Sequence, residues 1–336
     1  MSSIISHEAL VAKLKHLPQP KYPWPNSIHP NFLEARQSYY AWIDRDYKFQ
    51  SESARKKHKS HNLTDLAARG FPYLRTLEEL RPVASYAANG AMMDDYFDRC
   101  SRQEMLGIVQ HIMALLKGEE TEEPINNGFL RQWWVLRQDA LQCDIPASIY
   151  RRFIDTIADT FNGYAEEKAY YAANIIPPLA VYTLIREATS GAVPFCKYVC
   201  MQKDYRRLPD AILNHPHLLR IEVICALLIG MHNDFISLPK ELMRPGDTMN
   251  IVKVFQNEHK MPLEEAYMAA LAHHDNYLKE FLVLQQHLPR FDDEWKNMVA
   301  EYVEDLGIMV SGVYAWHTND TTRYVPGGYV EGEFGG

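Results

Sequence analysis

The sequence predicts an all-α protein built as one large helical domain. Apolar residues recur at helical spacing along the chain from about residue 30. No convincing run of alternating apolar and polar residues indicates strands, and no Asn-Gly or Asp-Gly hairpin separates such runs. The interruptions between helical stretches are short, as antiparallel neighbours require. With 336 residues, 47% of them apolar, the chain can bury a sizeable core in a single bundle.

The N-terminal and C-terminal stretches differ from the rest. Residues 1–31 carry five prolines within thirteen positions, and proline fixes φ and lacks a backbone N–H, so we expect an extended arm there. Residues 325–336 are rich in glycine, and we expect a flexible tail. The basic run from Arg55 to Lys59 is expected to be a solvated loop, with a phosphate-binding patch as the alternative. Helices are expected near residues 32–47, 64–81, 83–101, 102–117, 124–141, 147–174, 177–189, 194–203, 208–236, 262–287 and 291–316.

Composition excludes several classes of protein. The formal net charge of −8 gives no electrostatic footprint for a nucleic-acid binder. The longest apolar run, Val223–Met231, is too short to span a membrane, and no secretory signal is visible at the N-terminus. We therefore expect a cytoplasmic protein, and the sequence leaves a homodimer possible. The scattered cysteines favour free thiols over a disulfide framework or a zinc site: Cys100, Cys143, Cys196, Cys200 and Cys225.

Three carboxylates end an otherwise apolar stretch: Asp94, Asp95 and Asp98. On a helix, Asp94 and Asp98 lie one turn apart, where like charges repel. A divalent cation would neutralise this repulsion, and an all-oxygen ligand set suits Mg²⁺ or Mn²⁺. An ordinary acidic helix end is the alternative.

A second polar cluster follows the most apolar helix. Asn233, Ser237 and Glu241 are spaced four residues apart and therefore lie on one helix face. An amide oxygen, a hydroxyl and a carboxylate are ligands for a hard cation, and Lys240 beside them is a compact positive charge suited to phosphate. Arg186 and the Arg323–Tyr324 pair supply further donors. Two Mg²⁺-type ligand sets with basic residues nearby suit a diphosphate.

These motifs resemble those of the bacterial class I terpene synthases (terpene cyclases). Asp94–Asp98 matches the family's DDxxD motif, and Asn233, Ser237 and Glu241 match its Asn/Ser/Glu triad. Arg186 resembles the diphosphate-sensing arginine, and Arg323–Tyr324 matches the C-terminal pair. The four motifs occur in the family's order and span residues 94–324.

The resemblance implies a class I terpenoid synthase-like domain over residues 32–324, around a deep apolar cavity with three Mg²⁺ ions at its mouth. It implies ionisation of a linear isoprenyl diphosphate, cyclisation to a cyclic terpene hydrocarbon or alcohol, and release of diphosphate. The bend at Thr189, Ser190 and Gly191 would pass diphosphate binding on to the substrate. Arg323–Tyr324 is expected to contribute little to stability until a diphosphate recruits it.

Aromatic side chains would stabilise the carbocation, and core packing is the alternative for each of them. Trp316 is the first candidate, followed by Tyr86 and Phe97. Ala91 stands where the family commonly has an aromatic residue, three positions before the first aspartate, and should face the cavity. The space that it leaves favours a C20 substrate, geranylgeranyl diphosphate, over the C15 farnesyl diphosphate. A sesquiterpene synthase strictly using farnesyl diphosphate is the alternative.

Other functions fit the sequence less well. A prenyl chain-elongating enzyme needs a second aspartate-rich motif, but Lys296 stands where the closing aspartate of Asp292–Lys296 should be. A class II cyclase needs DxDD, and Asp44–Tyr47 lacks one aspartate. A di-iron bundle needs Glu-x-x-His, which does not occur. A non-enzymatic helical interaction protein stays as the alternative from a different class.

Overall fold

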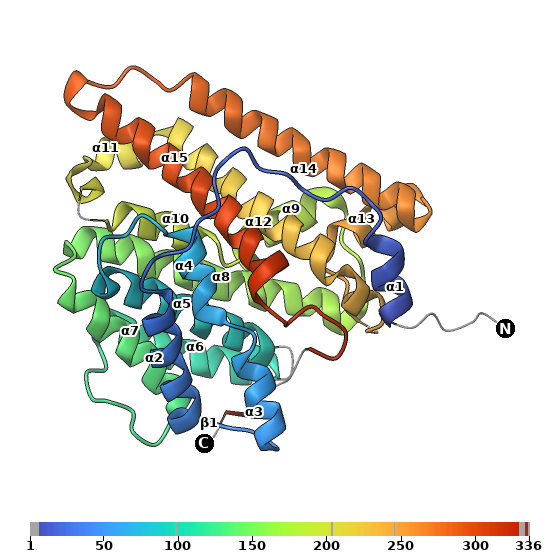
Figure 1. Cartoon of the computed structure of the whole chain (residues 1–336), viewed down its shortest axis with the longest axis horizontal. Helices are drawn as coiled ribbons and strands as arrows, with labels where there is room; N and C mark the ends of the chain where they lie inside the picture. The colour runs from blue at the N-terminus through green and yellow to red at the C-terminus, as the bar shows by residue number, and fades with distance from the viewer. Residues whose placement is uncertain (1–6, 98–99, 203, 245, 329–332, 335–336) are drawn as a thin grey trace.

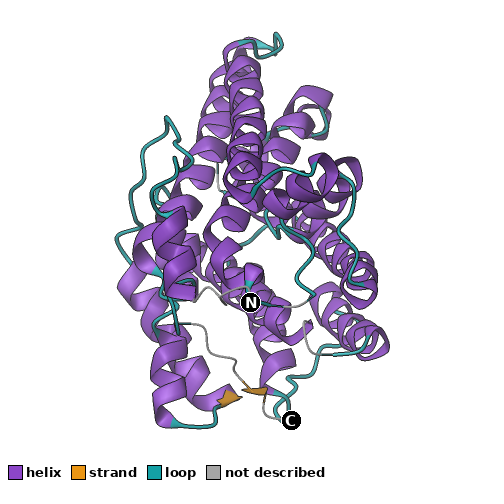
Figure 2. Cartoon of the chain, turned by 90° about the vertical axis from the view of Figure 1, so that its right-hand side faces the viewer, coloured by secondary structure: helices purple, strands orange, loops and turns teal. Residues whose placement is uncertain are grey.

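The all-α prediction is confirmed by a computed structural model that describes residues 7–97, 100–202, 204–244, 246–328 and 333–334 (Figure 1). Within these ranges the only strands are the two-residue β1 (Tyr47–Lys48) and β2 (Glu333–Phe334), which pair antiparallel at one end of the bundle (Figure 2).

The longer helices are α2 (Phe32–Asp46), α5 (Leu77–Phe97), α6 (Arg102–Lys117), α7 (Gly128–Gln142), α8 (Ala147–Ala173), α9 (Leu179–Thr189), α12 (Pro216–Leu242), α14 (Leu263–Gln286) and α15 (Asp293–Ala315). The shorter ones are α1 (His7–Leu14), α3 (Glu52–Lys59), α4 (Leu63–Gly70), α10 (Val193–Cys200), the 3₁₀ turn η1 (Tyr205–Arg207), α11 (Asp210–Leu213), α13 (Ile251–His259) and the π-helical η2 (Trp316–Asp320).

Helix α12 is the central element of the bundle. It packs against α9, α10, α13, α14 and α15, and most of its side chains are buried. By length and composition α12 would also be apolar enough to cross a membrane, but 83% of its most apolar window is buried inside the protein. Burial on all sides explains why it is apolar all round, as expected for a core helix.

Helix α5 runs unbroken through Pro82, although the sequence predicted a boundary there. Proline cannot donate to the carbonyl four residues earlier, which is that of Glu78. The thiol of Cys143 donates to this carbonyl at 3.1 Å, so the freed acceptor keeps a partner. The continuous helix carries the aspartate motif at its C-terminal end.

Three short helices were not predicted. The arm begins with α1, because the prolines start only at Pro18, and is extended after it. The basic run lies in α3 and not in a loop; Ser51 caps this helix by accepting from the backbone N–H of Ala54 at 3.1 Å. Helix α13 begins at a second side-chain cap, Asn250, which accepts from Val252 N–H at 2.9 Å.

The extended part of the arm lies across α15 and toward α14 (Figure 1). Trp24 packs edge-to-face on Phe281 of α14, with ring centroids 4.6 Å apart. It also covers Gly307 of α15, where a Cβ would come within 2.2 Å of the indole. The arm is therefore seated on the bundle by a close fit that no larger residue at position 307 would allow.

Candidate active site

A cavity of about 140 Å³ lies between α5, α7, α8, α9, α12, α15 and η2. It brings together residues from motifs that are up to 230 positions apart in the chain. Polar groups at one side are Asp94, Arg186, Asn233, Arg323 and Tyr324, and the rest of the wall is largely apolar or aromatic. The other lining residues are Leu66, Tyr86, Ala87, Gly90, Ala91, Trp133, Thr160, Phe161, Tyr164, Thr189, Ser190, Gly191, Phe195, Ile229, Val313, Trp316 and His317.

The two aspartates at the end of α5 have different surroundings. Asp94 lines the cavity with a side chain 51% exposed, whereas Asp95 is buried and ion-paired with both terminal nitrogens of Arg323. Burial in the cavity wall and the neighbouring Asp95 raise the pKa of Asp94, while Arg323, Lys240 and Arg186 oppose that rise. Asp98 lies outside the described residues. The motif therefore presents one carboxylate to the cavity and uses the next to hold Arg323.

The predicted triad lies along one continuous helix, α12. Asn233 lines the cavity, Ser237 is buried one turn on, and the Glu241 carboxylate accepts from Asn250 Nδ2 at 2.8 Å. Lys240 does not line the cavity, but its charge acts on that of Asp94, and burial and the nearby Arg323 lower its pKa. Of the triad, Asn233 alone lines the cavity, while Ser237 and Glu241 follow it along the same helix.

Arg186 of α9 is fixed against α12 by Asp234. Its Nη2 donates to Asp234 Oδ1 at 2.7 Å and to Asn233 Oδ1 at 3.0 Å, while Asp234 Oδ2 accepts from Tyr182 Oη at 2.5 Å. Burial raises the pKa of Asp234 to about 6, and Arg186 opposes this rise. Nε of Arg186 is buried without a partner among the described residues. Arg186 lines the cavity, so a fixed positive charge suited to an anionic ligand lies in its wall.

The C-terminal pair is buried and hydrogen-bonded within the fold, whereas we expected a loosely held pair that contributes little. Arg323 is 5% exposed and paired with Asp95, and Tyr324 Oη accepts from Asn233 Nδ2 at 2.8 Å. The preceding turn η2 is tied to the neighbouring helix α4, because Arg69 binds Asp320 through two hydrogen bonds of 2.6 and 3.0 Å. Removing either partner of the Arg323–Asp95 pair would therefore leave a buried charge that has lost its main counterion.

Most of the predicted wall residues line the cavity. Ala91, Tyr86 and Trp316 do, and the Trp316 indole N–H donates to the carbonyl of Asn62 at 2.8 Å, which leaves its ring for the cavity. Phe97 does not line it: the side chain packs on Phe161 and Tyr164 and borders a smaller neighbouring pocket. Three residues beyond Asp94 on a helix, it is turned toward α8. Trp133, Phe161 and Tyr164 supply aromatic rings that we did not predict.

The predicted bend after Arg186 also borders the cavity. Thr189, Ser190 and Gly191 all line it, and Gly191 has φ +66°, a conformation that suits glycine. The hydroxyl of Tyr86 donates to the Gly191 carbonyl at 2.9 Å. This bond ties the turn that follows α9 to α5.

Three further polar residues of the site were missed from the sequence. Glu167 of α8 is buried, its carboxylate accepts from Tyr171, and burial raises its pKa to about 7. His317 contacts Asn233, and its pKa is lowered to about 3, chiefly by burial and also by nearby Arg323 and Arg186. Asp234 could have been found from the sequence, since it lies inside the triad motif. Nothing in the sequence links Glu167 or His317 to partners so distant along the chain.

The residues present fit divalent cations bound with a diphosphate. Asp94, Asn233, Ser237 and Glu241 offer only oxygen ligands, the set that Mg²⁺ prefers. Asp94 and Asn233 both line the cavity, and the guanidinium groups of Arg186 and Arg323 lie beside them, so cation ligands and anion donors share one wall. No three His, Cys, Asp or Glu side chains within the described ranges form a metal cluster by themselves. Metals here would therefore be shared between α5, α12 and the anion.

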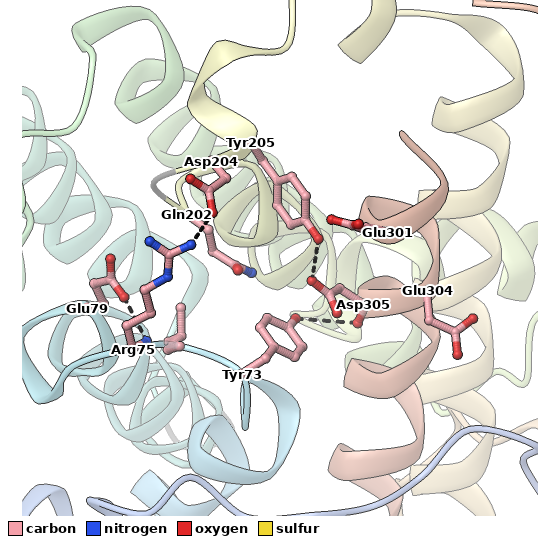
Figure 3. A pocket seen from close by; sticks show the side chains of 10 residues that line it. Tyr73, Arg75, Glu79, Gln202, Asp204, Tyr205, Glu301, Glu304 and Asp305 are labelled. Carbon is pink, nitrogen blue, oxygen red and sulfur yellow. Dashed lines mark hydrogen bonds and ion pairs between the residues drawn. The ribbon is translucent and has the colours of Figure 1, made fainter. Parts of the chain in front are cut away.

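A second, larger hollow of about 350 Å³ lies at the opposite end of α5 and α15 (Figure 3). None of the predicted site residues borders it. Its polar groups bind one another: Arg75 pairs with Asp204, and Tyr205 donates to Asp305 at 2.6 Å. Because these partners satisfy each other, we assign the function to the cavity beside Asp94 and Asn233.

Comparisons with known proteins agree with this assignment. The family model described as "Terpene synthase family 2, C-terminal metal binding" matches residues 86–280. The chain is 28% identical to (+)-T-muurolol synthase ((2E,6E)-farnesyl diphosphate cyclizing) of Roseiflexus castenholzii, over 91% of this chain and 93% of that one. It is 25% identical to Sesquiterpene synthase 9 of Postia placenta, over 90% and 86%. Its fold is similar to that of the linalool/nerolidol synthase from Streptomyces clavuligerus, with a TM-score of 0.75 at 17% identity over 88% of this chain and 99% of that one. The chain thus belongs to terpene synthase family 2 and is a class I terpene synthase that depends on a divalent metal.

Proposed function

We propose that this enzyme is a sesquiterpene cyclase that binds farnesyl diphosphate with three Mg²⁺ ions and converts it to a cyclic C15 hydrocarbon or alcohol. The observation that carries the proposal is the cavity itself, with Asp94, Arg186, Asn233, Arg323 and Tyr324 on one side and aromatic rings around the rest. A charged head and an apolar tail would both find their complement there.

The basic groups would hold the diphosphate. Arg186 lines the cavity and is fixed by Asp234, Arg323 is positioned by Asp95, and Lys240 adds a positive charge to the same region. Asp94, Asn233, Ser237 and Glu241 would hold the metals, which stabilise the leaving diphosphate and so favour ionisation of the allylic carbon. Closing the mouth excludes water and strengthens these charge interactions.

The wall would then guide the carbocation. Aromatic faces attract a cation by ~0.5–2 kcal/mol each without capturing it as a nucleophile would. Trp316, Trp133, Phe161 and Tyr164 lie around the cavity, and Tyr86 holds the Gly191 carbonyl at the end of the sensing helix. That bond is the path by which diphosphate binding at Arg186 would be passed on to the substrate.

The C15 assignment departs from the C20 preference expected from Ala91. The space beside Ala91 is bordered by rings of α7 and α8, of which Trp133 and Tyr164 are examples, so one small residue does not imply a long cavity. The relatives also favour C15, since two are named as sesquiterpene synthases and one as farnesyl diphosphate cyclizing. All five cysteines are free, which is consistent with the reducing cytoplasm that we propose as its compartment.

The decisive experiment is incubation of the purified enzyme with C10, C15, C20 and C25 diphosphates and Mg²⁺, with diphosphate release and the extracted products measured. We expect the highest kcat/KM with C15 and a cyclic product. A higher kcat/KM with C20 would restore the original chain-length expectation. Absence of diphosphate release from all four, with or without Mn²⁺, would contradict the proposal.

A further inference from the structure

We propose that His317 is a positioning residue that holds the amide nitrogen of Asn233 toward itself and Tyr324, which keeps the amide oxygen available as a metal ligand. His317 lines the cavity from the π-helical turn η2, 84 positions after Asn233 in the chain. Its ring nitrogen Nε2 lies 3.0 Å from Asn233 Nδ2. The inference rests on the proposed role of Asn233 as a metal ligand.

The tautomer of His317 follows from its other contact. Nδ1 lies 3.0 Å from the backbone carbonyl of Val313, and a carbonyl oxygen only accepts hydrogen bonds. Nδ1 therefore carries the hydrogen. In the neutral ring, Nε2 then has a lone pair and can only accept, so the atom of Asn233 that faces it must be the amide NH₂.

The opposite side of Asn233 gives the same orientation independently. Arg186 Nη2 lies 3.0 Å from Asn233 Oδ1, and a guanidinium only donates, so this atom must be the oxygen. The second amide hydrogen goes to Tyr324 Oη at 2.8 Å. Both N–H groups of Asn233 are thus taken by His317 and Tyr324, and the oxygen is left on the side of Arg186.

A flipped amide would be costly in two places at once. The NH₂ group would face the donors of Arg186, and the oxygen would face the lone pair of His317 Nε2. Partners of this kind around a metal ligand commonly change metal affinity by about 10–100-fold when they are removed. His317 should therefore affect the binding of metal more than the chemical step.

Two amide variants of His317 separate this role from packing. His317→Gln places an amide oxygen near the position of Nε2 and can still accept from Asn233. His317→Asn keeps a donor near Nδ1 for Val313 but is too short to supply that acceptor. Thr318→Ala is the matched control, since Thr318 is exposed on the same turn and donates to backbone carbonyls of α15.

The readouts are the rise in Tm caused by Mg²⁺ with inorganic diphosphate and the Mg²⁺ concentration that gives half-maximal turnover. We expect His317→Asn to need about 10–100-fold more Mg²⁺, with kcat at saturating Mg²⁺ less affected. We expect His317→Gln to recover most of the loss and Thr318→Ala to match the wild type. If His317→Asn does not fold, His317→Leu replaces it.

Two results would overturn the inference: wild-type Mg²⁺ dependence in His317→Asn, or equal losses in the Asn and Gln variants. Asn233→Ala distinguishes this from failure of the proposed function. If Asn233→Ala loses its response to metal while His317→Asn does not, only the positioning role is wrong. If Asn233→Ala also responds as the wild type does, the metal assignment of Asn233 is wrong.

Discussion

Neighbouring residues of one motif have different surroundings in this site. The Asp94 side chain is half exposed and lines the cavity, and burial in the cavity wall, with Asp95 beside it, raises its pKa. Asp95, one position on, is buried against the guanidinium of Arg323. A shared motif therefore contains one residue that is suited to a ligand and one that maintains the structure.

This difference predicts opposite effects of two alanine substitutions. Asp94→Ala should abolish turnover and leave the Tm of the metal-free enzyme unchanged or slightly higher, because it removes charge repulsion. Asp95→Ala should destabilise the metal-free enzyme by up to about 3–5 kcal/mol, because it removes the bidentate counterion of the buried Arg323 and leaves the longer contact of 3.9 Å to Asp94. Chemical denaturation and diphosphate release check both. Equal stability losses, or near-normal turnover of Asp94→Ala, would contradict the assignment.

Ala91 tests the cavity wall at the same scale. A phenyl ring at this position would project into the space beside Asp94 and overpack a bound isoprenyl chain. Ala91→Phe should therefore lower kcat/KM for geranylgeranyl diphosphate more than for farnesyl diphosphate. The ratio of kcat/KM for geranylgeranyl diphosphate to that for farnesyl diphosphate is measured in the variant and in the wild type. Ala87→Phe tests a second position of the wall. An unchanged ratio would show that Ala91 does not limit chain length.

Residue spacing predicted the parts of the site that share one helix. Asp94 and Asp95 on α5, and Asn233, Ser237 and Glu241 on α12, are local patterns and lie where the spacing put them. His317 and Glu167 could not be found this way, because their importance depends on contacts between helices that only the fold brings together. The orientation of Phe97 toward α8 was missed for the same reason.

At the scale of elements, the long helices were predictable and the short ones were not. A helix such as α12 or α15 repeats its apolar period many times, whereas α3 and α13 have only about two turns each. Side-chain caps and tertiary packing decide such short helices. Pro82 misled the prediction because the thiol of Cys143 takes up the carbonyl that proline leaves without a donor.

The N-terminal arm supplies a prediction for an element. The hydroxyl of Tyr22 lies 2.9 Å from His232 Nδ1 on α12 and 2.8 Å from His274 Nε2 on α14. Tyr22→Phe would leave these buried nitrogens unsatisfied, at a cost of about 1–3 kcal/mol. We expect a lower Tm with the same helical content. Tyr170→Phe, which alters a partly exposed tyrosine of α8, is the control. No loss of stability in Tyr22→Phe would show that this network does not hold the arm.

The C-terminal segment gives a pH prediction. His61, next to α4, donates from Nε2 to the Gly328 carbonyl at 2.9 Å, and burial lowers its pKa to about 3. A histidine whose pKa is lower in the folded state stabilises the protein above pH 6.5 and loses that contribution as pH falls toward 3. His61→Gln retains a donor but no titrating group, so its stability should fall less steeply between pH 6.5 and 4.5.

His111, an exposed histidine of α6, provides the control for this measurement. His111→Gln should follow the wild-type curve of Tm against pH. Equal slopes for the wild type and both variants would show that His61 does not account for acid sensitivity.

At the scale of the whole molecule, the cavity mouth is assembled from separate parts of the chain. Asp94 comes from α5, Arg186 from α9, Asn233 from α12 and Arg323 from the segment after η2. Internal bonds link all four segments, including Arg323 to Asp95, Arg186 to Asn233 and Asn233 to Tyr324. The sequence predicted which segments meet, through the order of its motifs, but not the bonds that join them.

A ligand shared by all four segments should stabilise the entire fold. We expect Mg²⁺ and inorganic diphosphate together to raise Tm by more than the sum of their separate effects, because each neutralises the charge that opposes binding of the other. At a ligand concentration of 100 times Kd the stabilisation is about 2.7 kcal/mol. Calorimetry at constant ionic strength measures Tm without ligand, with Mg²⁺, with diphosphate and with both. Sulfate in place of diphosphate is the control. EDTA should remove both the shift and the turnover while the helical signal stays the same. Additive shifts, or an equal shift from diphosphate in EDTA, would mean that the anion binds without metal and that Asp94 and Asn233 do not take part in one shared site.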